Sequence, residues 1–137
     1  MTLKDNLNSA DRFAATNGMQ ITTIKEGYAK TQMTVEEKHL NAAGVCQGGA
    51  LFTLADLSIA AALNSQKFLT VGIQNSISFL KSAKQGDILT SEAIEVVNHP
   101  KIPYVNATIT NQNGEIIAVM TGQGYRKKDE MKFDTLI

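Results

Sequence analysis

The sequence has few of the residues that a disulfide scaffold or a zinc site needs. Its one cysteine, Cys46, excludes a disulfide within the chain, and its two histidines have no partner at the spacing of metal ligands. An excess of charge of one sign is also lacking, because thirteen Lys and Arg balance thirteen Asp and Glu, and only residues 126–128 form a basic run. We therefore expect no resident metal and no nucleic-acid partner.

Long hydrophobic runs and phosphate-binding motifs are missing as well. The longest mostly apolar segment, Ala50–Leu63, is shorter than the ~20 residues that cross a bilayer, and it contains Asp56. No stretch near the start combines a basic end, an apolar centre and a cleavage site, so we expect a cytoplasmic protein without a membrane span. The chain has no G-x-S-x-G or P-loop motif and no G-x-G-x-x-G after a strand, which removes support for a serine-hydrolase triad or a nucleotide-phosphate site.

The chain has 137 residues, the length of one domain, and we expect a single domain over residues 1–137. Within it, several segments have a regular spacing of apolar residues. Apolar residues at helical spacing predict an amphipathic helix from Leu3 to Ala14, and alternation predicts a hairpin over 19–35. After a polar connection, Gly48 to about Ser65 is typical of a long helix. Turn signals divide the rest into consecutive strands, at 70–81, 88–97, 104–110 and 116–126. This order predicts an α+β fold, with one antiparallel sheet of about six strands wrapped around the long central helix.

Asp56 is a charge inside the long helix, on a face that it shares with large apolar side chains. Helical spacing places it in one stripe with Phe52, Ile59 and Leu63. The other faces are also mostly apolar, so we expect the helix to be buried on all sides. An ionised carboxylate loses hydration there unless it is paired or meets water in a cleft, and its pKa should rise. Asp56 is therefore a candidate functional acid, with a solvent-facing gap or a bond to a loop as the structural alternative.

Two adjacent glycines, Gly48 and Gly49, begin the helix, where each costs ~1 kcal/mol relative to alanine. The first N–H groups of a helix are unpaired and lie at the positive end of its dipole, which suits a carbonyl oxygen acquiring negative charge. The pair is a candidate oxyanion site, with tight packing as the alternative. Gly48 and Asp56 are ~12 Å apart along a helix, so one carbonyl cannot contact both in one chain. If both act on one substrate, a twofold dimer must bring Gly48 of one chain to Asp56 of the other.

The segment from His39 to Asp56, HLNAAGVCQGGALFTLAD, resembles the signature of hot-dog fold acyl-CoA thioesterases of the phenylacetate-degradation type. Its asparagine, glycine pair and L-A-D recur at the spacings of that family, and ISFLKSAKQGD, Ile77 to Asp87, is similar to the family's strand and turn. The expected order of elements agrees over most of the chain. The resemblance implies hydrolysis of an acyl-CoA, with coenzyme A as part of the substrate and no separate cofactor. It also implies a homodimer at minimum, arranged as a dimer of dimers.

The resemblance assigns roles to residues of this motif. Asp56 would be the nucleophile or general base, and the N–H of Gly48 would polarise the thioester carbonyl. Asn41 would position the attacking water or the carbonyl, unless it serves only to form a turn. Gln47 stands where relatives often carry histidine, so it keeps hydrogen bonding but lacks a titratable group.

Further positions are expected to contact the substrate. Gly49 neighbours the oxyanion donor, and Lys101 lies in the turn at 98–101, where the family commonly has a basic turn near the phosphates of coenzyme A. Gly72 is expected to line the site from the strand after the helix. Relatives often carry a serine or threonine there, or at the position that aligns with Ala60. Neither residue has a hydroxyl, so a helper group of the site is expected to be missing.

Some alternatives fit parts of the sequence. Cys46 precedes the helix start, where a thiolate could be stabilised, but the sequence places no base beside it. A hydratase or dehydratase of the same fold would need a histidine with the carboxylate, and the arrangement of Asp56 and Gly48 without a nearby histidine favours hydrolysis. A non-catalytic acyl-CoA-binding or sensing module would explain the missing hydroxyl, but it would gain little from a buried acid at Asp56. We therefore predict an enzyme, an acyl-CoA thioesterase.

Overall fold

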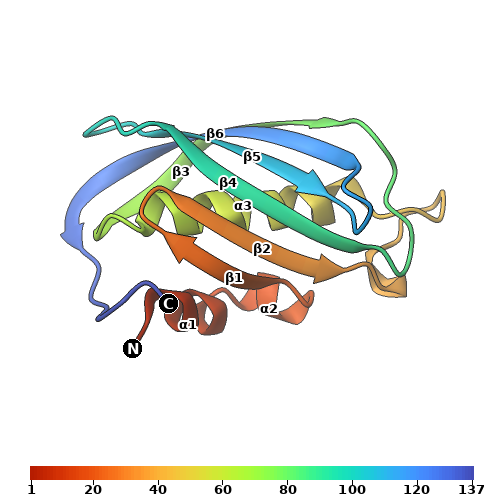
Figure 1. Ribbon diagram of the computed structural model, residues 1–137, viewed down its shortest axis with the longest axis horizontal. Coiled ribbons are helices and arrows are strands. Elements are labelled where there is room, and N and C mark those ends of the chain that lie inside the picture. The colour runs from red at the N-terminus through yellow and green to blue at the C-terminus, as the bar shows by residue number, and fades with distance from the viewer.

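The computed structural model describes residues 1–137 and has one long helix enclosed by a single curled sheet (Figure 1). Short helices precede the sheet, and none of the helices is both long and apolar enough to cross a membrane. The elements in chain order are α1 (Leu3–Ala10), α2 (Arg12–Thr16), β1 (Gln20–Lys25), β2 (Tyr28–Thr34), the 3-10 helix η1 (Glu37–His39), α3 (Gly48–Asn64), β3 (Phe68–Phe79), β4 (Ile88–Val97), β5 (Tyr104–Thr110) and β6 (Ile116–Glu130).

Neighbouring strands of the sheet are antiparallel, in the order β1-β2-β4-β5-β6-β3. The predicted hairpin over 19–35 is confirmed, since β1 pairs with β2. β3 does not pair with β4, the next strand in sequence, but with β6 at the far side of the sheet. The turn at 85–87 therefore belongs to a crossover rather than to a hairpin, and β1 and β3 are the edges of the sheet.

The N-terminal helix differs from the prediction, because it is split into α1 and α2 at Asp11. Asp11 has φ −81° and ψ 88°, outside the helical region, and its side chain accepts a hydrogen bond from Ala14 N at 3.1 Å. An aspartate can satisfy a free N–H of a helix start in this way, so it begins a new helix within a segment of helical spacing. The helix ending at Asn17-Gly18 is as predicted, with Gly18 at φ 72°.

Close contact between α3 and the sheet depends on two glycines of β6. A Cβ at Gly122 would lie 2.9 Å from Cδ1 of Ile59, and a Cβ at Gly124 would lie 2.9 Å from Cδ1 of Leu63. Both of these α3 side chains are buried, which is worth about 1.5–3 kcal/mol for each. A side chain at either glycine would push the helix away from the sheet, so the glycines fix how deeply α3 is seated.

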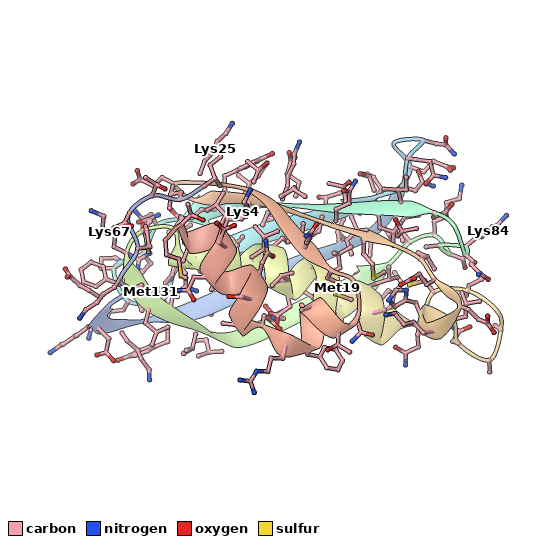
Figure 2. The ribbon with its side chains drawn as sticks, turned by 90° about the horizontal axis from the view of Figure 1, so that it is seen from below. Lys4, Met19, Lys25, Lys67, Lys84 and Met131 are labelled. Carbon is pink, nitrogen blue, oxygen red and sulfur yellow. The ribbon has the colours of Figure 1, made fainter.

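The prediction that α3 is buried on all sides is wrong. A stripe of the helix remains half-exposed, and it consists of Phe52, Thr53, Asp56 and Ala60, with the exposed Gly49 at its start. Figure 2 shows α1 and α2 in front of part of α3, on the open side of the curled sheet. The sheet curls around only part of the helix, and the apolar Phe52 and Ala60 gave no sign in the sequence that this face is left uncovered. Asp56 lies on that face.

Candidate active site

Asp56 lies in the middle of α3, and its side chain reaches the edge strand β3. Its Oδ1 accepts a hydrogen bond from Nδ2 of Asn75 at 2.8 Å, whereas Oδ2 has no hydrogen-bond partner in the chain. Burial raises the pKa of the Asp56 carboxyl, the hydrogen bond from Asn75 acts in the opposite direction, and the charge of Asp11 adds to the rise. The pKa thus shifts in the direction expected from the sequence, and one carboxylate oxygen is free for chemistry.

The start of α3 distinguishes the two glycines from each other. Gln47 is the N-cap residue, and its Oε1 accepts a hydrogen bond from Gly49 N at 2.6 Å. The N–H of Gly48 donates no hydrogen bond within the chain. A Cβ at Gly48 would lie 2.9 Å from Cζ of Phe79, so close packing is also a reason for this glycine. Of the two predicted donors, Gly48 is therefore the one whose N–H is available to a carbonyl oxygen.

The helix start lies between two cavities. One, of about 450 Å³, contacts Gly48 and is lined by Asn41, Val45, Cys46, Leu51, Phe79 and Ser82, among others. The other, of about 560 Å³, contacts Gly49 and is lined by Phe13, Met19, His39, Gln47 and Thr53, among others. Met19 is labelled in Figure 2, beside the N-terminal part of α3. A group held at the first turn of α3 thus has space on both sides.

Asn41 lies in the connection before α3, where it forms a turn. Its Oδ1 accepts hydrogen bonds from Ala43 N at 2.9 Å and from Val45 N at 3.3 Å. Its Nδ2 has no hydrogen-bond partner in the chain, and Asn41 lines the cavity that contacts Gly48. The turn-forming function of Asn41 is therefore present, and the same side chain also borders the candidate oxyanion site.

Gly72 and Lys101 are not brought together with Gly48. Gly72 is exposed on β3, near Asn75, and Lys101 lines a cavity of about 240 Å³ together with Phe68, Arg126, Lys127 and Lys128. Phe68 begins β3, whereas Phe79, beside Gly48, ends it. A strand of this length spans roughly 35 Å, so the basic cluster and the helix start are at opposite ends of one chain.

The cysteine and histidines are not arranged for catalysis. Cys46 is buried, and burial raises the pKa of its thiol to about 11, which opposes formation of a thiolate. His39 is also buried, and its Nδ1 accepts a hydrogen bond from Glu36 N while Nε2 lies 2.8 Å from the carbonyl oxygen of Asn17. His99 Nδ1 accepts hydrogen bonds from the backbone of its own turn. Both histidines have structural partners, and neither is beside Asp56.

Comparison with known proteins gives the same assignment as the motif. A family model described as "Thioesterase superfamily" matches residues 43–118, which contain α3 with Asp56 and the strands β3, β4 and β5. The chain belongs to the thioesterase superfamily. A putative esterase of Archaeoglobus fulgidus is 38% identical over 93% of this chain and 83% of its own length. The acyl-coenzyme A thioesterase PaaI of Escherichia coli is 34% identical over 85% of this chain and 83% of its own.

Similar solved structures confirm the fold. The structure of E. coli PaaI superposes with a TM-score of 0.90 at 31% identity, covering 93% of each chain. A Streptococcus mutans protein bound to acetyl-CoA superposes with a TM-score of 0.79 at 29% identity, covering 82% of this chain and 91% of its own. The α+β hot-dog fold and the resemblance to the phenylacetate-degradation type are therefore both confirmed.

Asp56 has one polar contact that the sequence pattern did not predict. Gly72 and Ala60 have no hydroxyl, as the sequence already implied, and the side chain that contacts Asp56 is Asn75. β3 contains a register shift between Gly72 and Gln74, so simple alternation along this strand assigns its later side chains to the wrong face. A polar residue in the strand was visible in the sequence, but its direction was not.

The raised pKa of Asp56 predicts that Asp56→Asn stabilises the protein at neutral pH. The folded chain binds this proton more tightly than the unfolded chain, so stability is lost as the pH rises through the folded-state pKa. We expect the melting temperature of Asp56→Asn to exceed that of the native protein by a few degrees at about pH 7.5, and by less at about pH 4.

The matched control is Asp87→Asn, for which the change in melting temperature should have the opposite sign. The N–H of Lys84, followed by the side chain of Gln112, holds the pKa of Asp87 below its usual value. Ionised Asp87 is stabilising, so its replacement should lower the melting temperature at neutral pH. Equal melting curves for native protein and Asp56→Asn across this pH range would contradict the assigned direction.

Proposed function

We propose that this chain hydrolyses an acyl-CoA thioester in a site shared by two subunits. The N–H of Gly48 polarises the thioester carbonyl, and Asp56 of the partner chain activates a water or attacks the carbonyl carbon directly. The observation that carries the proposal is the pair formed by a free N–H at the start of α3 and a half-buried carboxylate on the uncovered stripe of the same helix. Their separation of ~12 Å along the helix requires the second chain.

The edge of the sheet supports a twofold dimer. β3 is an edge strand, and it carries exposed apolar side chains, Val71, Ile73 and Phe79. Such an edge is open to pairing with another strand, and pairing removes apolar surface from water. In an antiparallel arrangement about a twofold axis, we place Phe79 of one β3, which contacts Gly48, beside Asn75 of the other, which contacts Asp56. Gly48 of each chain then approaches Asp56 of its partner, and two equivalent sites form.

Two routes of hydrolysis are open to this site. In the first, Asp56 takes a proton from a water whose oxygen attacks the carbonyl carbon, and the carbon–sulfur bond breaks to release the thiolate of coenzyme A, which takes up a proton. In the second, Oδ2 of Asp56 attacks the carbon itself, the carbon–sulfur bond breaks to release the thiolate of coenzyme A, which takes up a proton, and water then hydrolyses the resulting anhydride to the free acid and Asp56. In both routes negative charge develops on the carbonyl oxygen, where the N–H of Gly48 stabilises it. Asn41 borders the same position.

Coenzyme A is the proposed leaving group for two reasons. E. coli PaaI is named an acyl-coenzyme A thioesterase, and the S. mutans protein was solved bound to acetyl-CoA. In addition, the basic cluster of Lys101, Arg126, Lys127 and Lys128 is at the Phe68 end of β3, so in the proposed dimer it lies on the chain that supplies Asp56, roughly 20 Å along β3 from Asn75. Cations there suit the phosphates of coenzyme A, although they are too far from Gly48 of their own chain.

Hydration of the acyl chain is less well supported than hydrolysis of the thioester. A hydratase needs a group that moves protons beside the carboxylate, and both ring nitrogens of His39 are engaged with backbone groups.

The dimer of dimers stays a prediction. It is favoured by apolar side chains exposed on β4, β5 and β6, namely Ile94, Val96, Tyr104 and Val119.

A panel of aromatic and aliphatic acyl-CoAs tests the proposal, with release of free thiol as the measurement. Each acyl-CoA is paired with the N-acetylcysteamine thioester of the same acid, which has the same reacting bond but no phosphates. We expect turnover of at least one acyl-CoA and a higher KM for its matched short thioester. Absence of turnover for every member would contradict the proposal, and tight binding without turnover would identify an acyl-CoA-binding module instead.

A further inference from the structure

A β-bulge in β3 determines which side chain of that strand reaches Asp56. Before the bulge, Gly72 pairs with Gly124, and after it Gln74 pairs with Gln123, so Ile73 is an extra residue with no partner in β6. An extra residue reverses the alternation of a strand. Asn75 and not Gln74 therefore points toward α3, as its hydrogen bond to Asp56 shows.

The surroundings of Asn75 are fitted to its amide. Asn75 pairs with Gly122 of β6, and a Cβ at Gly122 would lie only 2.5 Å from Oδ1 of Asn75. On its own strand, a Cβ at Gly72 would lie 4.0 Å from Nδ2 of Asn75, an ordinary van der Waals contact. The glycine at 122 thus leaves the space in which the Asn75 side chain lies across to Asp56.

The amide makes only one of the hydrogen bonds available to it. Nδ2 donates to Oδ1 of Asp56 at 2.8 Å, and Oδ1 of Asn75 is buried without a hydrogen-bond partner. An unpaired buried carbonyl oxygen is unfavourable for folding, and a leucine of similar size would avoid it. Stability therefore does not explain the choice of asparagine here, whereas a donor directed at the carboxylate does.

The geometry points to Asn75 as a positioning residue, which fixes Oδ1 of Asp56 and directs the free Oδ2 toward the thioester. This inference rests on the proposed function, and it assigns to Asn75 the helper task for which neither Gly72 nor Ala60 has a hydroxyl. The amide of Asn75 can hold the carboxylate without gaining or losing a proton itself. It donates to the ionised carboxylate, and it adds no charge to a site that already has Asp11 nearby.

Asn75→Leu tests this inference, because it keeps the approximate size of the side chain and removes the donor. We expect kcat at neutral pH to fall about tenfold or more, the value of a hydrogen bond to a charged group, with little change in KM. The acid limb of the kcat profile should move to higher pH, because the ionised form of Asp56 loses its donor. Asp11 is the charged group that also acts on this carboxyl, and it is unchanged in the variant.

The matched control is Gln74→Leu, the same kind of change at the neighbouring, exposed position of β3. Gln74→Leu should leave kcat and the acid limb unchanged. Asn75→Leu should melt at the native temperature or above it, since the unpaired carbonyl oxygen is removed. A loss of kcat that follows a loss of melting temperature, or a native kcat and acid limb in Asn75→Leu, would overturn the inference.

A titration without turnover separates this inference from the proposed function. In protein labelled with ¹³C at aspartate carboxyl groups, the signal absent from Asp56→Asn identifies Asp56. Its pKa should be higher in Asn75→Leu than in native protein, and native in Gln74→Leu. This outcome is expected even if no thioester is hydrolysed, and an unchanged Asp56 titration in Asn75→Leu would overturn the positioning function whatever the substrate.

Discussion

Asp56→Asn is expected to lower kcat for acyl-CoA hydrolysis by about a thousandfold or more, the scale of losing a general base or a nucleophile. Asparagine has nearly the same shape as aspartate, and its amide oxygen can still accept the hydrogen bond from Asn75. It can neither take a proton from water nor form an anhydride, so both proposed routes stop. KM should change little, because the acid acts in the reaction and not in holding coenzyme A.

Asp11→Asn is the matched control for this experiment. Asp11 is the other carboxylate that acts on Asp56, and asparagine can replace it as an N-cap of α2. Removal of its charge should lower the pKa of Asp56, which extends activity to lower pH without loss of kcat at neutral pH. If Asp56→Asn kept more than about a tenth of native kcat, the acid would have no direct part in the chemistry.

Much of the fold follows from the sequence because its signals are local. Periodicity and turn residues predicted α3 and the strands β4 and β5 to within a residue. The position of β3 could not be predicted in this way, since its pairing with β6 is a contact between distant segments, and the nearby turn at 85–87 gives no sign of a crossover. The split at Asp11 depended on one side-chain cap, which spacing does not reveal.

The candidate site was likewise predicted only in part from the sequence. Asp56 was identified because a charge within an apolar helix is conspicuous in any sequence. Which glycine has a free N–H depends on the rotamer of Gln47, whose Oε1 occupies the N–H of Gly49. Asn75 reaches Asp56 only because of the bulge after Gly72. Both of these details require three-dimensional contacts, and both concern how the acid and the oxyanion donor are held.

Activity is expected to return when two inactive variants are mixed. The first is Asp56→Asn, and the second is Gly48→Pro, which removes the proposed oxyanion donor. Proline is tolerated at the first position of a helix, and Gln47 has the extended conformation, φ −66° and ψ 139°, that a residue before proline adopts. Gly48→Ala is its matched control, because it brings a Cβ against Phe79 but keeps the N–H. Gly48→Pro should lose about a hundredfold or more in kcat, and Gly48→Ala much less.

In a mixed dimer of the two variants, the sites are no longer equivalent. One site combines the intact Gly48 of the Asp56→Asn chain with the intact Asp56 of the Gly48→Pro chain, and the other site lacks both groups. Random exchange at equal concentrations makes about half of the dimers mixed, each with one native site, so about a quarter of native activity should return. If Gly48 and Asp56 of the same chain formed one site, every chain in the mixture would carry a broken site. Activity of the mixture equal to the average of the two separate variants would therefore contradict the shared site, even with each variant inactive as expected.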